Sequence, residues 1–329
     1  MSTRLSRRTV TAAGFLALTS ILWSQQAVEA LAQSAFPSKE ITLIVPYAPG
    51  GSGDILARQY GDLLGKELGV SVVIENAPGG SGTIGTVKIF GSEPDGHTIG
   101  YGHNSPLSIQ PHKNAGLPYK NAEDFTTIGG IGHQAGTVSV NGASEIETFA
   151  DFVAAAQARP GELSVAVGGA GNVKDLQLQQ VEKAAGIDLN IVPFAGGGAE
   201  AVMAVMGQIV DAVSVNSSSV AGQVASGDIR PIAIFANSDK EEIAGFEVIN
   251  DKDLPGLKFL QDSSGIIAPK GLPDDVLSVL EAAHQKIMSD PAYIAILEDD
   301  GNVVDAADSA EYRAQLMDDY ANFGELVAQ

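Results

Sequence analysis

Two glycine-rich turns near the start of the chain have the composition of an anion-binding site. The first turn, Pro46 to Gly53, follows the apolar run Ile41 to Val45 and precedes residues with helical spacing from Asp54 onwards. Glycine has no Cβ atom, so the backbone of such a turn can approach a ligand closely. The first amides of the following helix point outward without partners and attract anions. Such a turn therefore favours the binding of a small anion.

A second turn of the same build follows. The run Val70 to Glu75 predicts a strand, Asn76 to Gly82 a turn, and Thr83 to Phe90 a short helix. A single turn of this kind is more often an ordinary connection between a strand and a helix. The repetition favours a site, because two turns side by side can grip one small anion.

Other chemistries have less support. Gly80 to Gly85 matches the G-x-G-x-x-G pattern of dinucleotide-binding folds, but no acidic residue stands at Tyr101 to Ser105, where the ribose ligand is expected. The five histidines form no i, i+4 pair, and the chain has no G-x-S-x-G elbow. His103 and Ser105 are a base and a nucleophile without an acid nearby in sequence, so an ordinary loop is the better interpretation there. We expect a binding protein with no metal, no cofactor and no enzymatic activity.

The charge excludes two classes of partner. The chain carries a formal charge of −21, and removal of residues 1–32, with three Arg and one Glu, would change this to −23. Nucleic acids and anionic lipids need a basic footprint, so neither is expected as a partner. No Lys or Arg lies between Pro46 and Asp54 or between Asn76 and Gly85. An anion bound there must be held by backbone amides, hydroxyl groups and water.

The N-terminus has the pattern of an export signal. Three arginines in the first eight residues precede the apolar run Ala12 to Trp23, and Ala30 to Ala32 has the small-x-small pattern of a cleavage site. Ser6 to Val10 resembles a twin-arginine signal, but Val stands where Phe is more usual. The twin-arginine and Sec pathways therefore both remain candidates for the export route. The apolar run is shorter than the ~18 residues of a spanning helix. The chain has no cysteine for disulfides or lipid attachment. We expect cleavage near Ala32 and a soluble, monomeric mature protein.

The remaining chain alternates strands and helices, which predicts an α/β fold with parallel sheets. About 297 residues remain after cleavage (329 less 32), and this length favours two lobes. Strands are expected at 41–45, 70–75, 97–101, 137–140, 163–167, 190–193, 211–215, 231–235 and 265–268. Helices are expected at 54–68, 83–90, 146–158, 173–185, 199–206, 220–226, 274–289 and 291–299.

Further candidate residues follow later strands. Gly168 to Asn172 and Phe194 to Gly198 are a third and a fourth glycine turn. Two turns in each expected lobe suggest that the lobes face each other. Asn104 and Asn216 come at the carboxyl ends of expected strands, where open α/β sheets bind ligands, although a simple polar loop is as good an interpretation of Asn104.

Five ordered segments carry a resemblance to a known family. They are PYAPGGSGD, IENAPGGSGTIG, SEPDGHTIGYG, LPYKNAEDFTTIG and IIAPKGLP. Together they resemble the periplasmic solute-binding proteins of tripartite tricarboxylate transporters, the Bug family. The resemblance implies a two-lobed periplasmic-binding-protein fold of type II-like form, with two α/β domains, a ligand cleft between them and two crossovers. It also implies a periplasmic receptor that binds a di- or tricarboxylate, an acidic amino acid or an aromatic acid. The implied partners are small and large integral-membrane transporter subunits.

The resemblance also assigns residues and domains. It places Tyr47, Ala48, Gly51 and Ser52 of the first turn, and Gly80, Ser81 and Thr83 of the second, around a ligand carboxylate. The expected lobes are 33–136 with 237–329, and 137–236. In the second lobe the chain departs from the family pattern, with Val167, Asp175 and Val215 at positions where Ser, His and Asp are common. The candidates there are Gly169, Ala170, Gly171, Asn172 and Asn216. A receptor for a membrane sensor kinase and, less favoured, an enzyme acting on a small carboxylate remain alternatives.

Overall fold

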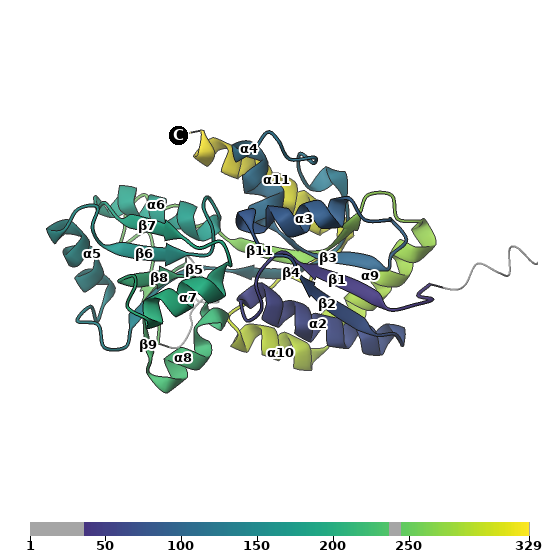
Figure 1. Ribbon diagram of the computed structural model, residues 1–329, viewed down its shortest axis with the longest axis horizontal. Helices are drawn as coiled ribbons and strands as arrows, with labels where there is room; N and C mark the ends of the chain where they lie inside the picture. Colours follow the sequence, from purple (N-terminus) through teal and green to yellow (C-terminus); the bar gives the residue numbers. More distant parts are fainter. Residues whose placement is uncertain (1–35, 237–244, 329) are drawn as a thin grey trace, which may run out of the picture. The chain divides into compact units, whose positions relative to one another are not determined.

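The structure is a computed structural model that describes residues 36–236 and 245–328 (Figure 1). The expected export signal, residues 1–32, lies outside the described residues. From Lys39 onwards the described strands form two six-stranded sheets. None of the described helices is long and apolar enough to cross a bilayer.

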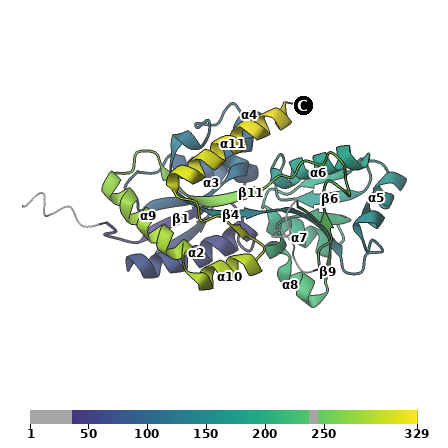
Figure 2. The ribbon, with the colours of Figure 1, turned by 180° about the vertical axis from the view of Figure 1, so that it is seen from behind.

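The first sheet has the order β12-β4-β11-β3-β1-β2. Its β1, β2 and β3 are parallel, whereas β11 runs antiparallel to both β3 and β4. Helices α2, α9 and α10 cover one face, and α3, α4 and α11 cover the other (Figures 1 and 2). The strands are β1 (Ile41–Val45), β2 (Val72–Asn76), β3 (Thr98–His103), β4 (Phe125–Gln134), β11 (Asp262–Pro269) and β12 (Val303–Val304), and the helices are α2 (Ser52–Leu68), α3 (Thr83–Phe90), α4 (Gln110–Lys113), α9 (Asp274–Met288), α10 (Pro291–Asp299) and α11 (Ser309–Val327).

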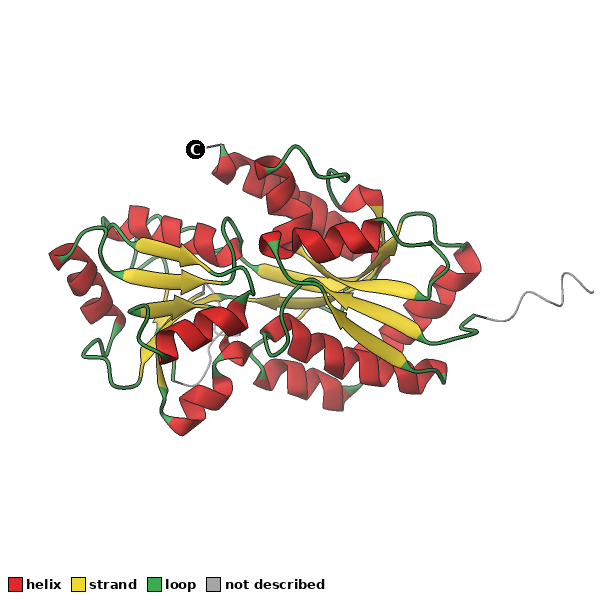
Figure 3. Ribbon diagram, in the orientation of Figure 1, coloured by secondary structure: helices red, strands yellow, loops and turns green. Residues whose placement is uncertain are grey.

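The second sheet has the order β10-β9-β5-β8-β6-β7. Its two apolar cores lie on opposite faces, one under α5 and α6 and the other under α7 and α8 (Figure 3). The strands are β5 (Gly136–Asn141), β6 (Ser164–Val167), β7 (Asn190–Pro193), β8 (Ala212–Ser214), β9 (Ile229–Phe235) and β10 (Val248–Ile249), and the helices are α5 (Phe149–Ala158), α6 (Val173–Ala185), α7 (Gly198–Met206) and α8 (Ala221–Ser226). The predicted α/β, two-lobed fold is confirmed.

Short helical turns complete the connections. Two of them follow strand ends of the first sheet: Gly80–Gly82 (η1) lies after β2 and Ser105–Ile109 (η2) lies after β3. The others are Ala122–Asp124 (η3) and Ser217–Ser219 (η4).

The chain passes between the sheets twice. β4 continues into β5 through the single residue Ala135, and the return runs from the end of β10 to the start of β11 at Asp262. β10 still pairs with β9, and Leu254 and Leu257 still belong to the core of the second lobe. The return to the first lobe therefore comes after residue 249, later than the expected boundary between 236 and 237, because two short apolar segments complete the second sheet and its core.

Candidate functional site

A cavity of about 60 Å³ lies between the two lobes. One water needs ~10–15 Å³ of such volume, so the cavity has room for a small ligand with a few heavy atoms. It is lined by Tyr47, Ala48, Gly51, Ser52, Gly53, Tyr101, His103, Ser105 and Asp262 from the first lobe, and by Gly168, Asn172, Val173, Lys174, Gly198, Ser214, Val215, Asn216 and Ser219 from the second.

Three helices begin at this cavity: α2 at Ser52, α6 at Val173 and α7 at Gly198. The cap residues of α2 and α7 are Gly51 and Gly197, neither of which offers a side chain to the first amides. Each helix N-terminus carries a partial positive charge from the helix dipole. Three such ends around one cavity favour an anionic ligand.

The first glycine turn meets the second lobe directly at the cavity. The Ser52 N–H donates to Ser219 Oγ at 3.1 Å, and Asn216 Nδ2 donates to Ser52 Oγ at 3.0 Å. A Cβ atom on Gly51 would lie 3.9 Å from the backbone nitrogen of Ala199, in the first turn of α7. The first and fourth glycine turns therefore face each other across the cavity. The four residues that the resemblance assigns to the first turn all line the cavity.

The second glycine turn faces the third outside the cavity. Ser81 Oγ donates to the Ala170 carbonyl at 2.8 Å, and Gln110 Nε2 donates to the carbonyls of Ala170 and Gly171 at 3.1 and 3.0 Å. Thr83 Oγ1 donates to the Gly80 carbonyl within its own turn, at 2.9 Å. The structure does not bring Gly80, Ser81, Thr83, Gly169, Ala170 or Gly171 into the cavity lining. Direct ligand binding by these six residues stays a prediction. The hydrogen bonds that Ser81, Ala170 and Gly171 make connect the two lobes, whereas the bond between Thr83 and Gly80 lies within the first lobe.

The three candidate asparagines lie in different surroundings. Asn172 lines the cavity and caps α6, because its Oδ1 accepts from the Asp175 N–H. Asn216 also lines the cavity. Asn104 is fully buried away from it, where its Nδ2 donates to the Gln261 carbonyl at 2.8 Å and to Asp319 Oδ2 at 3.1 Å.

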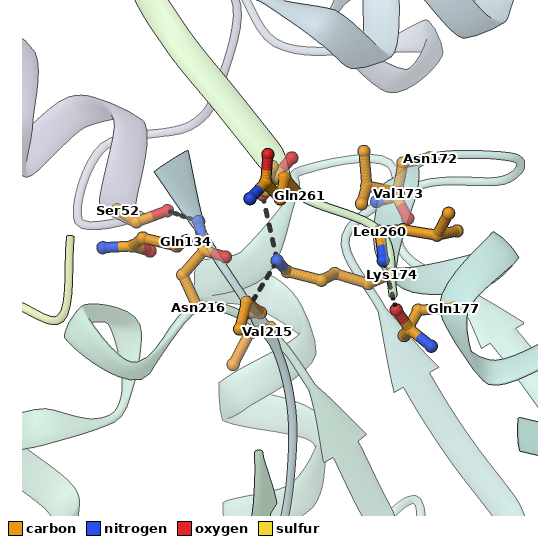
Figure 4. A network of polar contacts seen from close by, with 12 residues as sticks. Ser52, Gln134, Asn172, Val173, Lys174, Gln177, Val215, Asn216, Leu260 and Gln261 are labelled. Carbon is orange, nitrogen blue, oxygen red and sulfur yellow. Dashed lines mark hydrogen bonds and ion pairs between the residues drawn. The ribbon is translucent and has the colours of Figure 1, made fainter. Parts of the chain in front are cut away.

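The cavity wall contains a charged group that was not predicted from the sequence. Lys174 Nζ lies 3.2 Å from Asp262 Oδ2, and His103 Nε2 lies 2.8 Å from Asp262 Oδ1. Lys174 reaches from α6 toward the two strands that join the lobes (Figure 4). Burial alone would raise the pKa of Asp262, but the charges of His103 and Lys174 hold that pKa well below its usual range. The only signal for this group in the sequence was the position of Lys174 directly after the third glycine turn.

His103 also holds Tyr47 at the cavity wall. The Tyr47 hydroxyl lies 2.9 Å from His103 Nδ1, and the two rings meet edge to face. Burial and the nearby charge of Asp262 raise the pKa of Tyr47 well above its ordinary value, so its hydroxyl keeps its proton. Tyr47 is therefore a neutral hydrogen-bonding group within the first turn.

The arrangement of His103 is unlike that of a catalytic base. Asp262 supplies the acid that the local sequence lacks, but it contacts Nε2, while Tyr47 and the Ser105 N–H both contact Nδ1. Both ring nitrogens are thus engaged, and Ser105 Oγ accepts from the Val173 N–H at 3.3 Å. Across the part of the chain that the structure describes, no group of three His, Cys, Asp or Glu side chains is placed to hold a metal ion.

Comparison with known proteins identifies the family. The family model described as the tripartite tricarboxylate transporter family receptor matches residues 56–329. The chain belongs to this family. Protein BugT of Bordetella pertussis is 26% identical over 296 residues, which cover 89% of this chain and 90% of BugT. A solved structure of a periplasmic transporter is 30% identical with a TM-score of 0.82, covering 90% of this chain and 98% of that one.

Family membership confirms the predicted resemblance and makes the chain a solute-binding receptor of the periplasmic TctC and Bug type. MatC from Rhodopseudomonas palustris, solved with bound malate, shares the fold with a TM-score of 0.80 and 23% identity, over 89% of this chain and 100% of MatC. A second R. palustris protein, solved with adipate, shares it with a TM-score of 0.82 and 22% identity, over 89% of this chain and 97% of that one.

Proposed function

We propose that this protein binds a small carboxylate in the cavity between its lobes and delivers it to a tripartite tricarboxylate-type membrane transporter. The observation that carries the proposal is the meeting of the N-termini of α2, α6 and α7 at one cavity. The malate and adipate bound by two proteins of the same fold support it.

Charge in the cavity wall supports an anionic ligand as well. Among the described residues that line the cavity, Asp262 is the only carboxylate, and it already contacts Lys174 and His103. The field inside the cavity is therefore not set by the strongly negative charge of the whole chain. Local amides and Lys174 act on the ligand at close range, where they outweigh distant surface charges that salt screens.

A thermal-shift screen tests the proposal. Carboxylates of different length, charge and substitution should include at least one that raises Tm, because a ligand that binds only the folded protein stabilises it by ~2.7 kcal/mol at a hundredfold excess over Kd. Calorimetry on the hits then gives Kd. Stabilisation by sugars, cations or nucleotides alone, with no response to any carboxylate, would contradict the proposal.

Location and delivery need separate measurements. We propose an exported, periplasmic monomer cleaved near Ala32, whose partners are the small and large integral-membrane subunits. Mass spectrometry of the exported protein should give the mass of a chain that begins near Gln33, and a mass that includes Ala12 to Trp23 would contradict cleavage.

Uptake of the identified ligand should require the receptor together with both membrane subunits. Uptake that is unchanged without the receptor would contradict delivery.

A further inference from the structure

A buried hydroxyl in the cavity wall has no hydrogen-bond partner among the described residues. Ser214 lies at the end of β8, is fully buried and lines the cavity, and its Oγ makes no hydrogen bond with any residue of the described ranges. Leaving a buried hydroxyl unpaired costs free energy comparable to a lost hydrogen bond, so such groups in a binding cavity usually meet a ligand or water. Ser214 therefore marks a point where a polar ligand atom fits.

A second unpartnered atom lies close to the expected carboxylate position. Asn216 uses its Nδ2 to donate to Ser52 Oγ at 3.0 Å, while its buried Oδ1 has no hydrogen-bond partner in the part of the chain that the structure describes. Ser52 is the first residue of α2, whose N-terminus faces the cavity. A ligand carboxylate at this helix end would bring its neighbouring carbon atom within reach of Asn216. The group that meets Asn216 is therefore a substituent on the carbon next to the carboxylate.

The cavity wall favours a neutral substituent over an ammonium group. Val215, which stands between Ser214 and Asn216, is buried and offers only methyl groups. Asp262 is the single carboxylate among the described lining residues, and it already contacts Lys174 at 3.2 Å and His103 at 2.8 Å. An ammonium group that entered this buried site would lose its hydration. Asp262 is already paired, so no free carboxylate among the described lining residues would compensate for that loss, which is costly in a buried site. A hydroxyl can donate to Asn216 Oδ1 and accept from Ser214 Oγ.

From these contacts we infer that the cavity selects a small 2-hydroxy carboxylate over the corresponding unsubstituted and 2-amino acids. The inference rests on the proposed function, because it assumes that a carboxylate occupies the N-terminus of α2. The inference adds to that function the chemical identity of the group on the carbon next to the ligand carboxylate. Ser214 and Asn216 are the residues that determine this selectivity.

Two matched sets of acids test the inference by calorimetry. The first set is propionate, lactate and alanine, and the second is succinate, malate and aspartate; within each set only the group on the carbon next to one carboxylate changes. The hydroxy acid should bind about tenfold more tightly than both of its counterparts in at least one set, since two neutral hydrogen bonds are gained. Equal or tighter binding of the unsubstituted or the amino acid in both sets would overturn the inference.

The same measurements separate this inference from the proposed function. If neither set binds but another carboxylate of the screen does, the hydroxy-acid inference is overturned and the carboxylate receptor stands. If no carboxylate binds at all, the proposed function fails and the inference fails with it.

A matched pair of serine variants tests the role of Ser214. Ser214→Ala should weaken binding of the hydroxy acid about three- to tenfold and leave the unsubstituted acid unchanged. Ser139→Ala is the control, because Ser139 is also fully buried with an unpartnered Oγ in the same sheet but does not line the cavity. Ser139→Ala should leave the affinities for both acids unchanged. Equal effects of the two variants on selectivity would overturn the assignment of Ser214.

A charge variant tests the role of Asn216. Asn216→Asp places a carboxylate without a cationic partner beside the first turn, so the preference should move from the hydroxy acid toward the amino acid by at least tenfold in the ratio of affinities. The Tm of Asn216→Asp without ligand shows whether this variant folds. If it does not fold, the Ser214→Ala measurement tests the inferred selectivity instead. A folded Asn216→Asp variant with an unchanged ratio would overturn the position assigned to the substituent.

Discussion

Lys174 and Asp262 form a buried ion pair between the two lobes, with 3.2 Å between Nζ and Oδ2. Lys174 lies in α6 of the second lobe, and Asp262 begins β11, where the chain has returned to the first. Lys174 Nζ also donates to the carbonyl of Ala135, the residue through which the chain first crosses between the sheets, at 3.2 Å. One side chain thus contacts both crossovers (Figure 4). The pair therefore links the cavity wall to both segments through which the chain passes between the lobes.

The first prediction is that Lys174→Met strongly destabilises the protein. The side chains of Lys174 and Asp262 are only 6% and 7% exposed, so removal of the lysine leaves a buried carboxylate with the His103 ring as its remaining partner. Loss of one partner of a buried pair costs ~3–5 kcal/mol. Denaturant unfolding measures the loss. Lys174→Met combined with Asp262→Asn should recover much of it, and a double variant no more stable than Lys174→Met would contradict this explanation.

The second prediction is that Gly51→Ala weakens ligand binding while the fold is retained. Gly51 has an ordinary φ of −80°, and an added Cβ would meet only the Ala48 carbonyl at 3.6 Å and the Ala199 nitrogen at 3.9 Å. The new methyl group would therefore occupy cavity space without straining the backbone. We expect at least about a tenfold loss of affinity, or ~1.4 kcal/mol, by calorimetry.

Gly222→Ala is the matched control for Gly51→Ala. Gly222 lies in α8, and a Cβ atom added there has open space around it. Its replacement should leave the affinity unchanged. If Gly51→Ala also leaves the affinity unchanged while the protein is folded, the first turn is not the carboxylate site.

The third prediction compares two hydroxyls of the second turn. Ser81→Ala removes the hydrogen bond to the Ala170 carbonyl across the cleft, whereas Thr83→Ala removes a bond to Gly80 inside the first lobe. A neutral hydrogen bond contributes ~0.5–1.5 kcal/mol, so Ser81→Ala should weaken the closed form and raise Kd about three- to tenfold. Thr83→Ala should change the stability of the first lobe with little effect on Kd. Equal effects on Kd would show that both hydroxyls contact the ligand, as the sequence alone suggested.

Elements with strong local signals were predicted well. The helices Thr83–Phe90, Val173–Ala185 and Pro291–Asp299 have the predicted bounds, and so does the strand Asn190–Pro193. Each begins or ends at a local signal: the first three follow a Gly, Asn or Asp cap position, and the strand ends at proline before a glycine turn. The first turn was located for the same reason, because strand, glycine turn and helix are adjacent in the sequence.

The strand β4 and the last helix α11 were missed for physical reasons. All ten residues of β4 are buried, so no polar alternation marks the strand, and three of them are glycines. A Cβ on Gly129 would come within 2.3 Å of the His284 ring, so this glycine is required by packing from a helix far away in sequence. Helix α11 has 19 residues, of which only Tyr312, Leu316 and Phe323 are buried. Apolar residues therefore recur too rarely along its sequence to give a clear helical pattern.

The charged group at the cavity was beyond local analysis. Lys174 follows the third glycine turn, but Asp262 and His103 come from β11 and β3 of the other lobe. Only the tertiary structure brings the three together, and it also places Ser81 against Ala170 rather than in the cavity. The sequence identified the turns correctly as elements, but which turn faces which depends on how the two lobes close.

The fourth prediction concerns the pH dependence of stability through His284. Its burial lowers its pKa from 6.5 to about 4, although the hydrogen bond to the Gly130 carbonyl opposes this shift. Between these values the unfolded chain binds more protons than the folded protein, so stability falls as the pH falls from about 6.5 to 4, by about 3 kcal/mol. His284→Gln removes this contribution. Denaturant unfolding of both proteins from pH 7 to 4 measures it, and identical pH profiles would contradict the assignment.

The last prediction is that Asp319 contributes in the opposite direction. Burial raises the pKa of its carboxyl group from 3.8 to about 6, against the effect of the hydrogen bond from Asn104. The folded protein therefore binds more protons than the unfolded chain between these values, and stability falls as the pH rises from about 4 to 6, by about 3 kcal/mol. Asp319→Asn keeps an acceptor for Asn104 and has no carboxyl to ionise, so it should be more stable than the natural protein at pH 7 and about equally stable at pH 4. Since His284 and Asp319 oppose each other over this range, the natural protein should have a flatter profile than either variant. A loss of stability at pH 7 in Asp319→Asn, measured by the same denaturant titration, would show that the ionised carboxylate stabilises the contact with Asn104 and that its pKa is not raised.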